Sequence, residues 1–246
     1  MPVASPPSPR TTPPRGLAVR TRTPELMDDP ALDADAHRAA LRALTRVHRV
    51  SRCGARFRGV LDRLFGSTSY PIRVLDIASG GGDLSLDIAR WGRDRKRDLQ
   101  VVGADLSPRA LEFAEARART EGLDIDWIEA DVLGAFPPGP FDLAVSSLFL
   151  HHLEDADVVT VLRSAAGQAR HIVVEDLHRS RLGFALAWGG LRLLSRAHVT
   201  HVDGPRSVRA AWRGREVEAL AAEAGMEGAR VRRAWPERLV LSWSRS

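Results

Sequence analysis

Short apolar runs alternate with longer amphipathic stretches through the middle of the chain. Each apolar run has the short length and the flanking turn residues of a buried strand. The runs predict strands at residues 73–78, 100–104, 125–129, 141–146 and 171–175. Between them, apolar residues at helical spacing predict helices at 84–91, 108–120 and 155–168. Strands that alternate with helices in this way are typical of a mainly parallel, doubly wound α/β sheet.

Cap residues mark the ends of two of these helices. Ser107 and Pro108 suit the N-cap and the first turn of the 108–120 helix, and Gly122 suits its C-terminal end. Asp83 is expected to be the N-cap of the 84–91 helix. The periodicity and the caps therefore agree on where these helices begin.

Helical patterns also flank this alternating core. Residues 24–66 carry two apolar faces at helical spacing and predict an N-terminal helical arm. Residues 181–212 form an insertion after the fifth strand. A helix and two strands follow it, at 215–224, 229–235 and 239–243. With 246 residues, 44% of them hydrophobic, one large core over residues 24–246 is expected in preference to two domains.

Composition limits the setting of the protein. Residues 1–23 are rich in proline and arginine and lack the apolar segment of a signal peptide, so a disordered tail is expected there. The single cysteine, Cys53, excludes an intrachain disulfide framework and a cysteine-based zinc cluster, and a reduced, cytoplasmic setting is expected. No uninterrupted apolar stretch is long enough to span a bilayer, so no transmembrane segment is predicted.

The net charge of +5 and the pI near 10.6 come almost entirely from arginine. Such a chain can bind nucleic acid non-specifically. However, aromatic residues make up only 6% of the chain, and no platform of aromatic and basic residues for stacking bases is visible. Nucleic acid is therefore not the expected partner.

Candidate chemistry centres on the glycines that follow the first predicted strand. Strand, glycine loop and helix together open a nucleotide-binding α/β unit, because glycines let the backbone turn sharply beside a ligand. In the dinucleotide pattern G-x-G-x-x-G, Gly80 and Gly82 fill the first two positions but Ser85 stands at the third. Asp76 and Asp83 bracket the loop, and these acids suit a cationic ligand better than a pyrophosphate.

This stretch resembles motif I of the class I S-adenosylmethionine-dependent methyltransferases. The departure is that Ser79-Gly80-Gly81-Gly82 stands where many members have G-x-G-x-G. Three further stretches resemble family motifs in the right order: Asp105 after the second strand, Ala130-Asp131-Val132 after the third, and the sequence from Phe141 to Leu153 with its L-H-H-L ending. The resemblance covers about residues 72–175, and the acid at Asp131 favours this family over a dinucleotide-binding one.

The resemblance implies a Rossmann-like sheet of seven strands, mostly parallel, with a C-terminal antiparallel hairpin, and S-adenosylmethionine as the cofactor. Asp105 would accept the ribose hydroxyls, Asp131 would bond the adenine amino group, and Asp76 would lie under the cationic end. The full set of expected cofactor contacts is Asp76, Ala78, Ser79, Gly80, Gly82, Asp105, Leu106, Asp131, Val132 and Ser146. The family's N/D-P-P-Y/F box is absent, which argues against N-methylation of adenine or cytosine.

His151 and His152 are the candidate catalytic bases, because an imidazole near neutrality can take a hydroxyl proton as the methyl group transfers. The alternative is that this pair only shapes the loop before the next helix. No carboxylate set accompanies the histidines in the sequence, so no metal site is predicted.

The insertion is the candidate acceptor site. Its apolar part, 182–194, is expected to form a helical lid, with Trp188, His201 and Arg209 as acceptor contacts. The arm and the apolar insertion resemble those of small-molecule methyltransferases of phenolic lipids, quinones and polyketides. This resemblance implies a small hydrophobic or aromatic acceptor, with O-methylation favoured over C-methylation. Two alternatives stay open for the lid: simple packing on the sheet, and peripheral contact with a membrane surface through its arginines. The rival functions are an RNA methyltransferase, a non-catalytic protein of the same fold and an NAD-dependent oxidoreductase. The oligomeric state is unknown.

Overall fold

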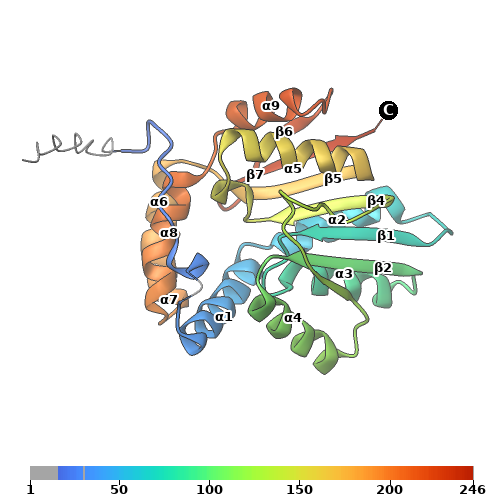
Figure 1. The fold of residues 1–246 in the computed structure, drawn as a ribbon, viewed down its shortest axis with the longest axis horizontal. Coiled ribbons are helices and arrows are strands. Elements are labelled where there is room, and N and C mark those ends of the chain that lie inside the picture. Colours follow the sequence, from blue (N-terminus) through green and yellow to red (C-terminus); the bar gives the residue numbers. More distant parts are fainter. Residues whose placement is uncertain (1–15, 30, 246) are drawn as a thin grey trace, which may run out of the picture.

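The computed structural model describes residues 16–29 and 31–245 (Figure 1). Within these residues the chain forms one seven-stranded sheet with the order β3-β2-β1-β4-β5-β7-β6. The strands are β1 (Ile72–Ile77), β2 (Leu99–Asp105), β3 (Asp126–Glu129), β4 (Phe141–Ser147), β5 (Ala169–Leu177), β6 (Arg230–Ala234) and β7 (Arg238–Ser244). Strands β1 to β5 run parallel, and β7 runs antiparallel to both β5 and β6. The predicted Rossmann-like sheet and its terminal hairpin are confirmed.

Helices cover both faces of this sheet. On one face, α2 (Cys53–Phe65) and α3 (Asp83–Asp94) enclose a core that includes the fully buried Trp91. On the other face, α5 (Asp155–Gln168) and α9 (Gly214–Glu223) pack over β4, β5 and β7. Helix α4 (Pro108–Glu121) lies along β2 and β3. Because both faces are covered, the central strands are apolar runs rather than alternating ones.

The expected caps hold for α4 but not for α3. The Ser107 hydroxyl accepts a hydrogen bond from the Ala110 amide, and Gly122 ends α4 in the left-handed conformation. Helix α3 is capped instead by Gly82, with φ +77°, and begins at Asp83. The Asp83 carboxylate turns to Arg117 on α4, with an N–O distance of 2.7 Å, so it joins two helices rather than capping one.

Residues 1–15 of the predicted tail lie outside the described residues. Residues 16–23, which the sequence also assigned to that tail, lie against the domain instead. Arg20 donates hydrogen bonds to the carbonyl oxygens of Ala210 and Leu153, each at 2.6 Å, and its guanidinium stacks 3.7 Å from the ring centre of Trp212. The Thr21 amide also donates to the Arg209 carbonyl oxygen at 3.0 Å, and Arg22 donates to the His152 carbonyl oxygen at 2.8 Å. Polar contacts of this kind hold the segment, and no apolar periodicity in the sequence predicts them.

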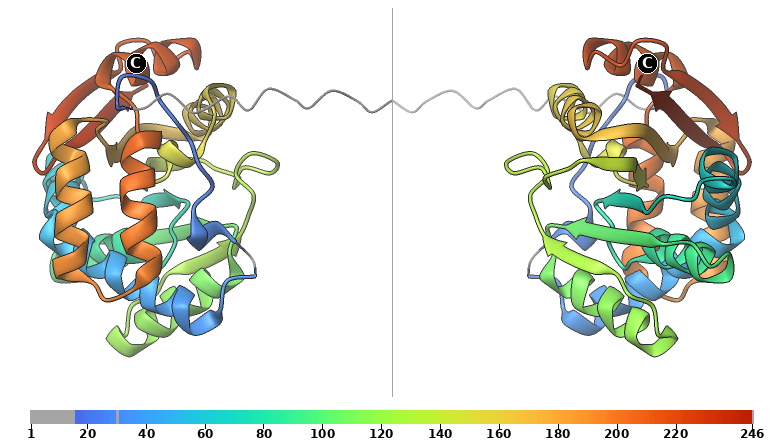
Figure 2. Two further views of the ribbon diagram at one scale, coloured as in Figure 1. Left: turned by 90° about the vertical axis from the view of Figure 1, so that its left-hand side faces the viewer. Right: turned by 90° about the vertical axis from the view of Figure 1, so that its right-hand side faces the viewer.

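Helix α1 of the arm and the insertion gather at one end of the sheet, whereas α2 lies on one of its faces (Figure 1). The arm consists of the short η1 turn (Leu26–Asp28), α1 (Ala34–Val50) and α2. The insertion consists of α6 (Arg181–Ala185), a π-helical segment η3 (Leu186–Gly190), α7 (Leu191–Leu194) and α8 (His198–Ala210). Figure 2 shows the α6–α7 unit and α8 side by side, and α8 also packs against α1 and η1.

No helix in residues 16–29 and 31–245 combines the length and the apolar character needed to cross a membrane.

Candidate functional site

A cavity of about 1130 Å³ opens at the carboxyl ends of the parallel strands. In the sheet, β2 lies on one side of β1 and β4 lies on the other, so the strand order reverses next to β1. Open α/β sheets bind ligands at such a switch point, and the cavity lies there. The loops after β1 to β5 form its floor, and the arm and the insertion form its opposite wall. The cavity therefore has two ends, one at the glycine loop and one under the insertion.

The glycine loop is shaped to admit a ligand. Gly80 has a φ of +52°, and a side chain built there would meet no atom within 4 Å, so its backbone faces open space in the cavity. A side chain at Gly82 would instead clash with Ala114 and Trp127, at 2.8 and 2.7 Å. The two glycines thus have different tasks: Gly80 leaves room for a ligand, whereas Gly82 lets α3 approach α4 and β3.

Asp105 ties the loop to the end of β2. One of its carboxylate oxygens accepts a hydrogen bond from the Gly80 amide at 2.7 Å, and the other accepts one from the Ser107 amide at 2.9 Å. Burial raises the pKa of Asp105, and these amide donors counter the rise. Each oxygen keeps a second lone pair, and the residue lines the cavity beside Leu106.

Two further predicted residues line the same end of the cavity after β3. Asp131 is exposed, and its Oδ1 atom accepts a hydrogen bond from the Leu133 amide at 3.0 Å, which fixes the turn. Val132 is buried and presents an apolar surface. An acid and an apolar side chain at adjacent positions suit a ring that carries an amino group.

The residues at this end fit an adenosine-type cofactor. Asp105 offers paired acceptors for a diol, and Gly80 leaves its backbone open to a ligand. The Ser79 hydroxyl, between the cavity-lining Ala78 and Gly80, is buried and has no hydrogen-bond partner among the described residues. Ala78, Gly80, Asp105, Leu106, Asp131 and Val132 all line the cavity, as the sequence predicted.

Four of the ten predicted cofactor contacts do not line the cavity: Asp76, Ser79, Gly82 and Ser146. Two of them, Asp76 and Ser146, lie beneath its surface. Asp76 is 1% exposed and accepts a hydrogen bond from the Ser85 hydroxyl at 2.6 Å; burial raises the pKa of Asp76 to about 7. The Ser146 hydroxyl donates to the carbonyl oxygen of Ile77 at 2.8 Å. Both side chains are therefore engaged in bonds that shape the strand ends. Sequence position alone could not show which way they point.

His151 stands at the centre of the cavity floor, in the short η2 turn (Leu150–His152). Its side chain is 3% exposed, and its Nδ1 atom lies 2.6 Å from Oδ1 of Asp176 at the end of β5. The Asp176 carboxylate also accepts the His151 amide at 2.9 Å. Burial alone would raise the pKa of Asp176, but the charge and hydrogen bond of His151 lower it below its ordinary value. Asp176 therefore stays ionised and orients the ring.

His152 forms a second imidazole–carboxylate pair next to the first. Its Nδ1 atom lies 3.1 Å from Oδ2 of Asp28, and the two histidine ring centres are 4.3 Å apart. Burial alone would lower the pKa of His152, but the bond to Asp28 and the charges of Glu25 and Asp28 raise it to about 9. At neutral pH His152 already holds a proton in this arrangement, which disfavours it as a base.

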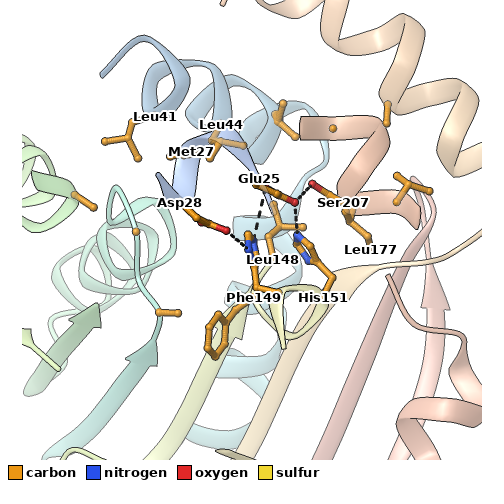
Figure 3. A pocket seen from close by; sticks show the side chains of 18 of the residues that line it. Glu25, Met27, Asp28, Leu41, Leu44, Leu148, Phe149, His151, Leu177 and Ser207 are labelled. Carbon is orange, nitrogen blue, oxygen red and sulfur yellow. Dashed lines mark hydrogen bonds and ion pairs between the residues drawn. The ribbon is translucent and has the colours of Figure 1, made fainter. Parts of the chain in front are cut away.

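Glu25 joins the two histidines (Figure 3). Its carboxylate oxygens lie 3.7 Å from Nε2 of His151 and 3.9 Å from Nε2 of His152. The Ser207 hydroxyl of α8 donates to the same carboxylate, and Asp203 accepts the amides of the next two residues, Leu26 and Met27, at 2.9 and 3.0 Å. Helix α8 therefore holds the Glu25 carboxylate through Ser207 and the backbone after Glu25 through Asp203.

Sequence reasoning missed Glu25, Asp28 and Asp176, and its premise that no carboxylates accompany the histidines is wrong. Asp176 follows directly on the predicted fifth strand, at the carboxyl end where site residues gather, so its position was a usable signal. Glu25 and Asp28 reach the site from more than one hundred residues away in the chain, and no local motif marks them.

The insertion supplies an apolar wall at the other end of the cavity. The wall continues onto α1, and its side chains are Leu41, Leu44, Val47, Leu186, Leu191 and Leu194. The three acceptor contacts predicted in the insertion do not face this wall. Trp188 is 54% exposed and packs under Arg192, His201 bonds the Ser195 carbonyl at 2.7 Å, and Arg209 is exposed over Phe184. A π-helical turn within the insertion shifts which residues face inward, which a regular helical period cannot foresee.

Known proteins resemble this chain in sequence and in fold. A family model described as a methyltransferase domain matches residues 74–170. The ubiquinone biosynthesis O-methyltransferase of Ralstonia nicotianae is 33% identical over 167 residues, which cover 65% of this chain and 65% of the relative. The enzyme of the same name from Bordetella parapertussis is 31% identical over 176 residues, with 69% and 67% covered. The match thus spans just under two thirds of the length of the Ralstonia relative.

Among solved structures, the plantazolicin methyltransferase BpumL, in complex with SAH, superimposes with a TM-score of 0.62 over 88% of this chain and 90% of that one, at 16% identity. At this identity the likeness shows the fold alone. The sequence match to the Bordetella relative covers more than two thirds of both chains. The glycine loop, the acid after β2 and the sheet order agree with it, and the chain belongs to the class I S-adenosylmethionine-dependent methyltransferases.

Proposed function

We propose that the protein transfers a methyl group from S-adenosylmethionine to a hydroxyl oxygen of a small, apolar, aromatic acceptor. One observation carries this proposal. The Glu25–His151–His152 cluster, in which His151 is buried, lines the same cavity as the residues that suit the cofactor and the leucines and valines of the apolar wall. An acceptor with an apolar body and one hydroxyl group could place its body against the apolar wall and its hydroxyl group at the cluster.

The cofactor end would be held by residues of the glycine loop and of the strand ends. Asp105 would accept the ribose hydroxyls, Asp131 would accept from the adenine amino group, and Val132 would contact the ring. When bound, the cofactor supplies an electrophilic methyl group on a sulfonium sulfur. The chain has to align the acceptor oxygen with that methyl carbon and exclude water, and the covering arm and insertion suit both tasks.

The acceptor end supports a lipophilic aromatic substrate. Its wall is apolar, and the cavity, at about 1130 Å³, exceeds the volume typical of a single small ligand. Relatives at 33% and 31% identity bear the name ubiquinone biosynthesis O-methyltransferase. We therefore propose phenolic or hydroquinone acceptors, and O-methylation in preference to C-methylation.

Transfer to a hydroxyl forms an oxygen–carbon bond and breaks the carbon–sulfur bond, whose electron pair stays on sulfur. The hydroxyl proton must leave as the new bond forms, because the attacking oxygen would otherwise become positively charged. Nε2 of His151 is the suited acceptor for this proton, because Asp176 bonds the opposite nitrogen of the same ring. Asp176 is then a positioning residue that also stabilises the imidazolium.

The direct test incubates the purified protein with S-adenosylmethionine and a panel of phenols that differ in alkyl chain length. Mass spectrometry of the products would detect the added methyl group, and fragmentation would show whether it sits on oxygen or on carbon. We expect O-methylated phenols, with turnover rising with chain length. Methylation of RNA with no phenol product, or carbon methylation alone, would contradict the proposal.

A further inference from the structure

Two histidines and a glutamate converge inside the cavity with their ligand atoms directed at one another. One ring nitrogen of His151, one of His152 and one carboxylate oxygen of Glu25 all lie within 4.8 Å of one another. Both Nε2 atoms approach a different oxygen of the same carboxylate, at 3.7 and 3.9 Å. Figure 3 shows the side chain of Glu25 directed toward His151 on the cavity floor.

The opposite nitrogen of each histidine ring is bound to a carboxylate. Asp176 holds Nδ1 of His151 at 2.6 Å, and Asp28 holds Nδ1 of His152 at 3.1 Å. Metal-binding histidines commonly have this arrangement, since a carboxylate at one nitrogen fixes the ring and makes the other nitrogen a better ligand. Both Nε2 atoms are thereby directed toward Glu25, and a metal ion bound there would displace the proton that His152 holds in the metal-free arrangement.

The charge balance of the cluster favours a cation. Three carboxylates, from Glu25, Asp28 and Asp176, surround two imidazoles, and four of these five side chains are buried or half-buried. Buried negative charge without a counter-charge is costly. Either protons on the imidazoles or a metal ion between them can supply that positive charge, and the convergence of both Nε2 atoms on Glu25 suits the single central ion.

We infer that Glu25, His151 and His152 bind one divalent metal ion of the zinc type within the cavity. Two imidazole nitrogens and one carboxylate form the ligand set of a zinc site that keeps an open position. At metal–ligand distances near 2.1 Å, tetrahedral ligand atoms lie about 3.4 Å apart. The two Glu25–histidine separations, 3.7 and 3.9 Å, exceed this by a few tenths of an ångström, and all three ligand atoms lie within 4.8 Å of one another, so side-chain rotations can close the site.

The open position would face the cavity, where the acceptor hydroxyl is proposed to lie. A bound cation lowers the pKa of a coordinated hydroxyl, so the proton would leave to solvent before methyl transfer and the oxygen would attack as an anion. In the metal-bound protein, Nε2 of His151 is then a ligand rather than a proton acceptor. This chemical role rests on the proposed function, whereas the binding site itself does not.

The test measures metal binding in the full chain without any acceptor. The protein, freed of its purification tag and stripped with a chelator, is titrated with Co²⁺ and followed by its visible absorption, and Zn²⁺ is then added as a competitor. We expect one equivalent of Co²⁺ to bind with the strong absorption of a four- or five-coordinate site, and Zn²⁺ to displace it.

Variants locate the ion. His152→Ala and Glu25→Gln should weaken Co²⁺ binding by at least about 100-fold, and Asp176→Asn by roughly 10- to 100-fold. His48→Ala is the matched control, since Nε2 of His48 pairs with Asp87 at 2.9 Å away from the cluster, and it should bind Co²⁺ as the parent does. Retained S-adenosylmethionine affinity shows that each variant is folded, and Glu25→Gln, which changes a single group, serves if His152→Ala does not fold.

The results separate the inference from the proposed function. Parent protein that binds no Co²⁺ or Zn²⁺, or binds them equally well as Glu25→Gln, would overturn the metal site, while methylation of phenols by that metal-free protein would leave the proposed function intact with His151 as base. Cluster-dependent metal binding without methylation of any phenol would support the site and count against the proposed acceptor.

Discussion

The two ends of the cavity are built in different ways. The cofactor end uses short contiguous stretches, in which Gly80 bonds Asp105 at the end of the neighbouring strand and Asp131 fixes its own turn. The acceptor end joins segments from across the chain, since Glu25 meets His151, and Asp28 meets His152 over a separation of 124 residues in the sequence. Both pairs are therefore long-range contacts. A ligand shared by a family can be bound by local motifs, whereas a site specific to one chain can be assembled by long-range packing.

The largest expected effect is at the junction of the two ends. His151→Ala should lower turnover by roughly 10²- to 10⁴-fold, because the hydroxyl proton loses its acceptor or its activating site. S-adenosylmethionine affinity, measured by calorimetric titration, should change little. His48→Ala breaks an imidazole–carboxylate pair elsewhere and should keep full turnover. Unchanged turnover in His151→Ala would return this histidine to a structural role and remove the chemical distinction between the two ends.

At the cofactor end, Asp105→Ala should weaken S-adenosylmethionine binding by about 100-fold. The change removes the proposed ribose acceptor and also leaves the Gly80 amide without its partner. The control is Asp124→Ala, an exposed aspartate in the loop before β3. Calorimetry that gives the parent affinity for Asp105→Ala would show that the cofactor is not held by the residues that the motifs indicate.

The N-terminal segment tests whether long-range contacts organise the acceptor end. Arg20 donates to the carbonyl oxygens of His151 and Leu153 and stacks on Trp212, so Arg20→Ala should lower the free energy of unfolding by about 2 kcal/mol. The KM for the acceptor should rise, while S-adenosylmethionine affinity stays within about two-fold. Arg22→Ala, an exposed neighbour paired with Glu154, should cost less than about 1 kcal/mol in denaturant unfolding. Equal losses for both variants would contradict an anchoring role for Arg20.

The buried carboxyl group of Asp76, which lies beneath the cofactor end of the cavity, should make the stability of the protein depend on pH. Its folded-state pKa of about 7 lies above its ordinary value of 3.8, so between these pH values the folded chain holds a proton that the unfolded chain has released. Stability should therefore fall as pH rises through this window, by up to about 1.4 kcal/mol per pH unit. Asp76→Asn should flatten that slope in urea titrations at several pH values. A slope identical to that of the parent would show that Asp76 is ionised throughout the window.

The sequence predicted the sheet, most helix bounds and the cavity-lining residues of the cofactor end, because period, caps and motifs act over a few residues. It could not predict Arg20, Glu25 or Asp28, whose partners lie on the far side of the chain. It also misjudged Trp188, which was expected at the acceptor because it belongs to the apolar part of the insertion but is 54% exposed within the π-helical turn Leu186–Gly190. Asp76 and Ser146 show a further limit: a motif places a residue near a ligand but does not fix the direction of its side chain.

The smallest expected effect concerns the exposed side of the insertion. Substitutions there test the remaining alternative, which is that the insertion contacts a membrane surface. Leu182, Trp188 and Leu193 are 49%, 54% and 89% exposed, and Arg181, Arg192 and Arg196 are exposed around them. Apolar side chains ringed by arginine favour an anionic lipid surface. Leu193→Asp should reduce sedimentation with vesicles that contain anionic lipid several-fold, and leave turnover on a short-chain phenol unchanged. Leu133→Asp, at an exposed leucine after β3, is the control for added charge. If both variants sediment as the parent does, exposure of this surface has no role in membrane contact, and the acceptor must reach the cavity from solution.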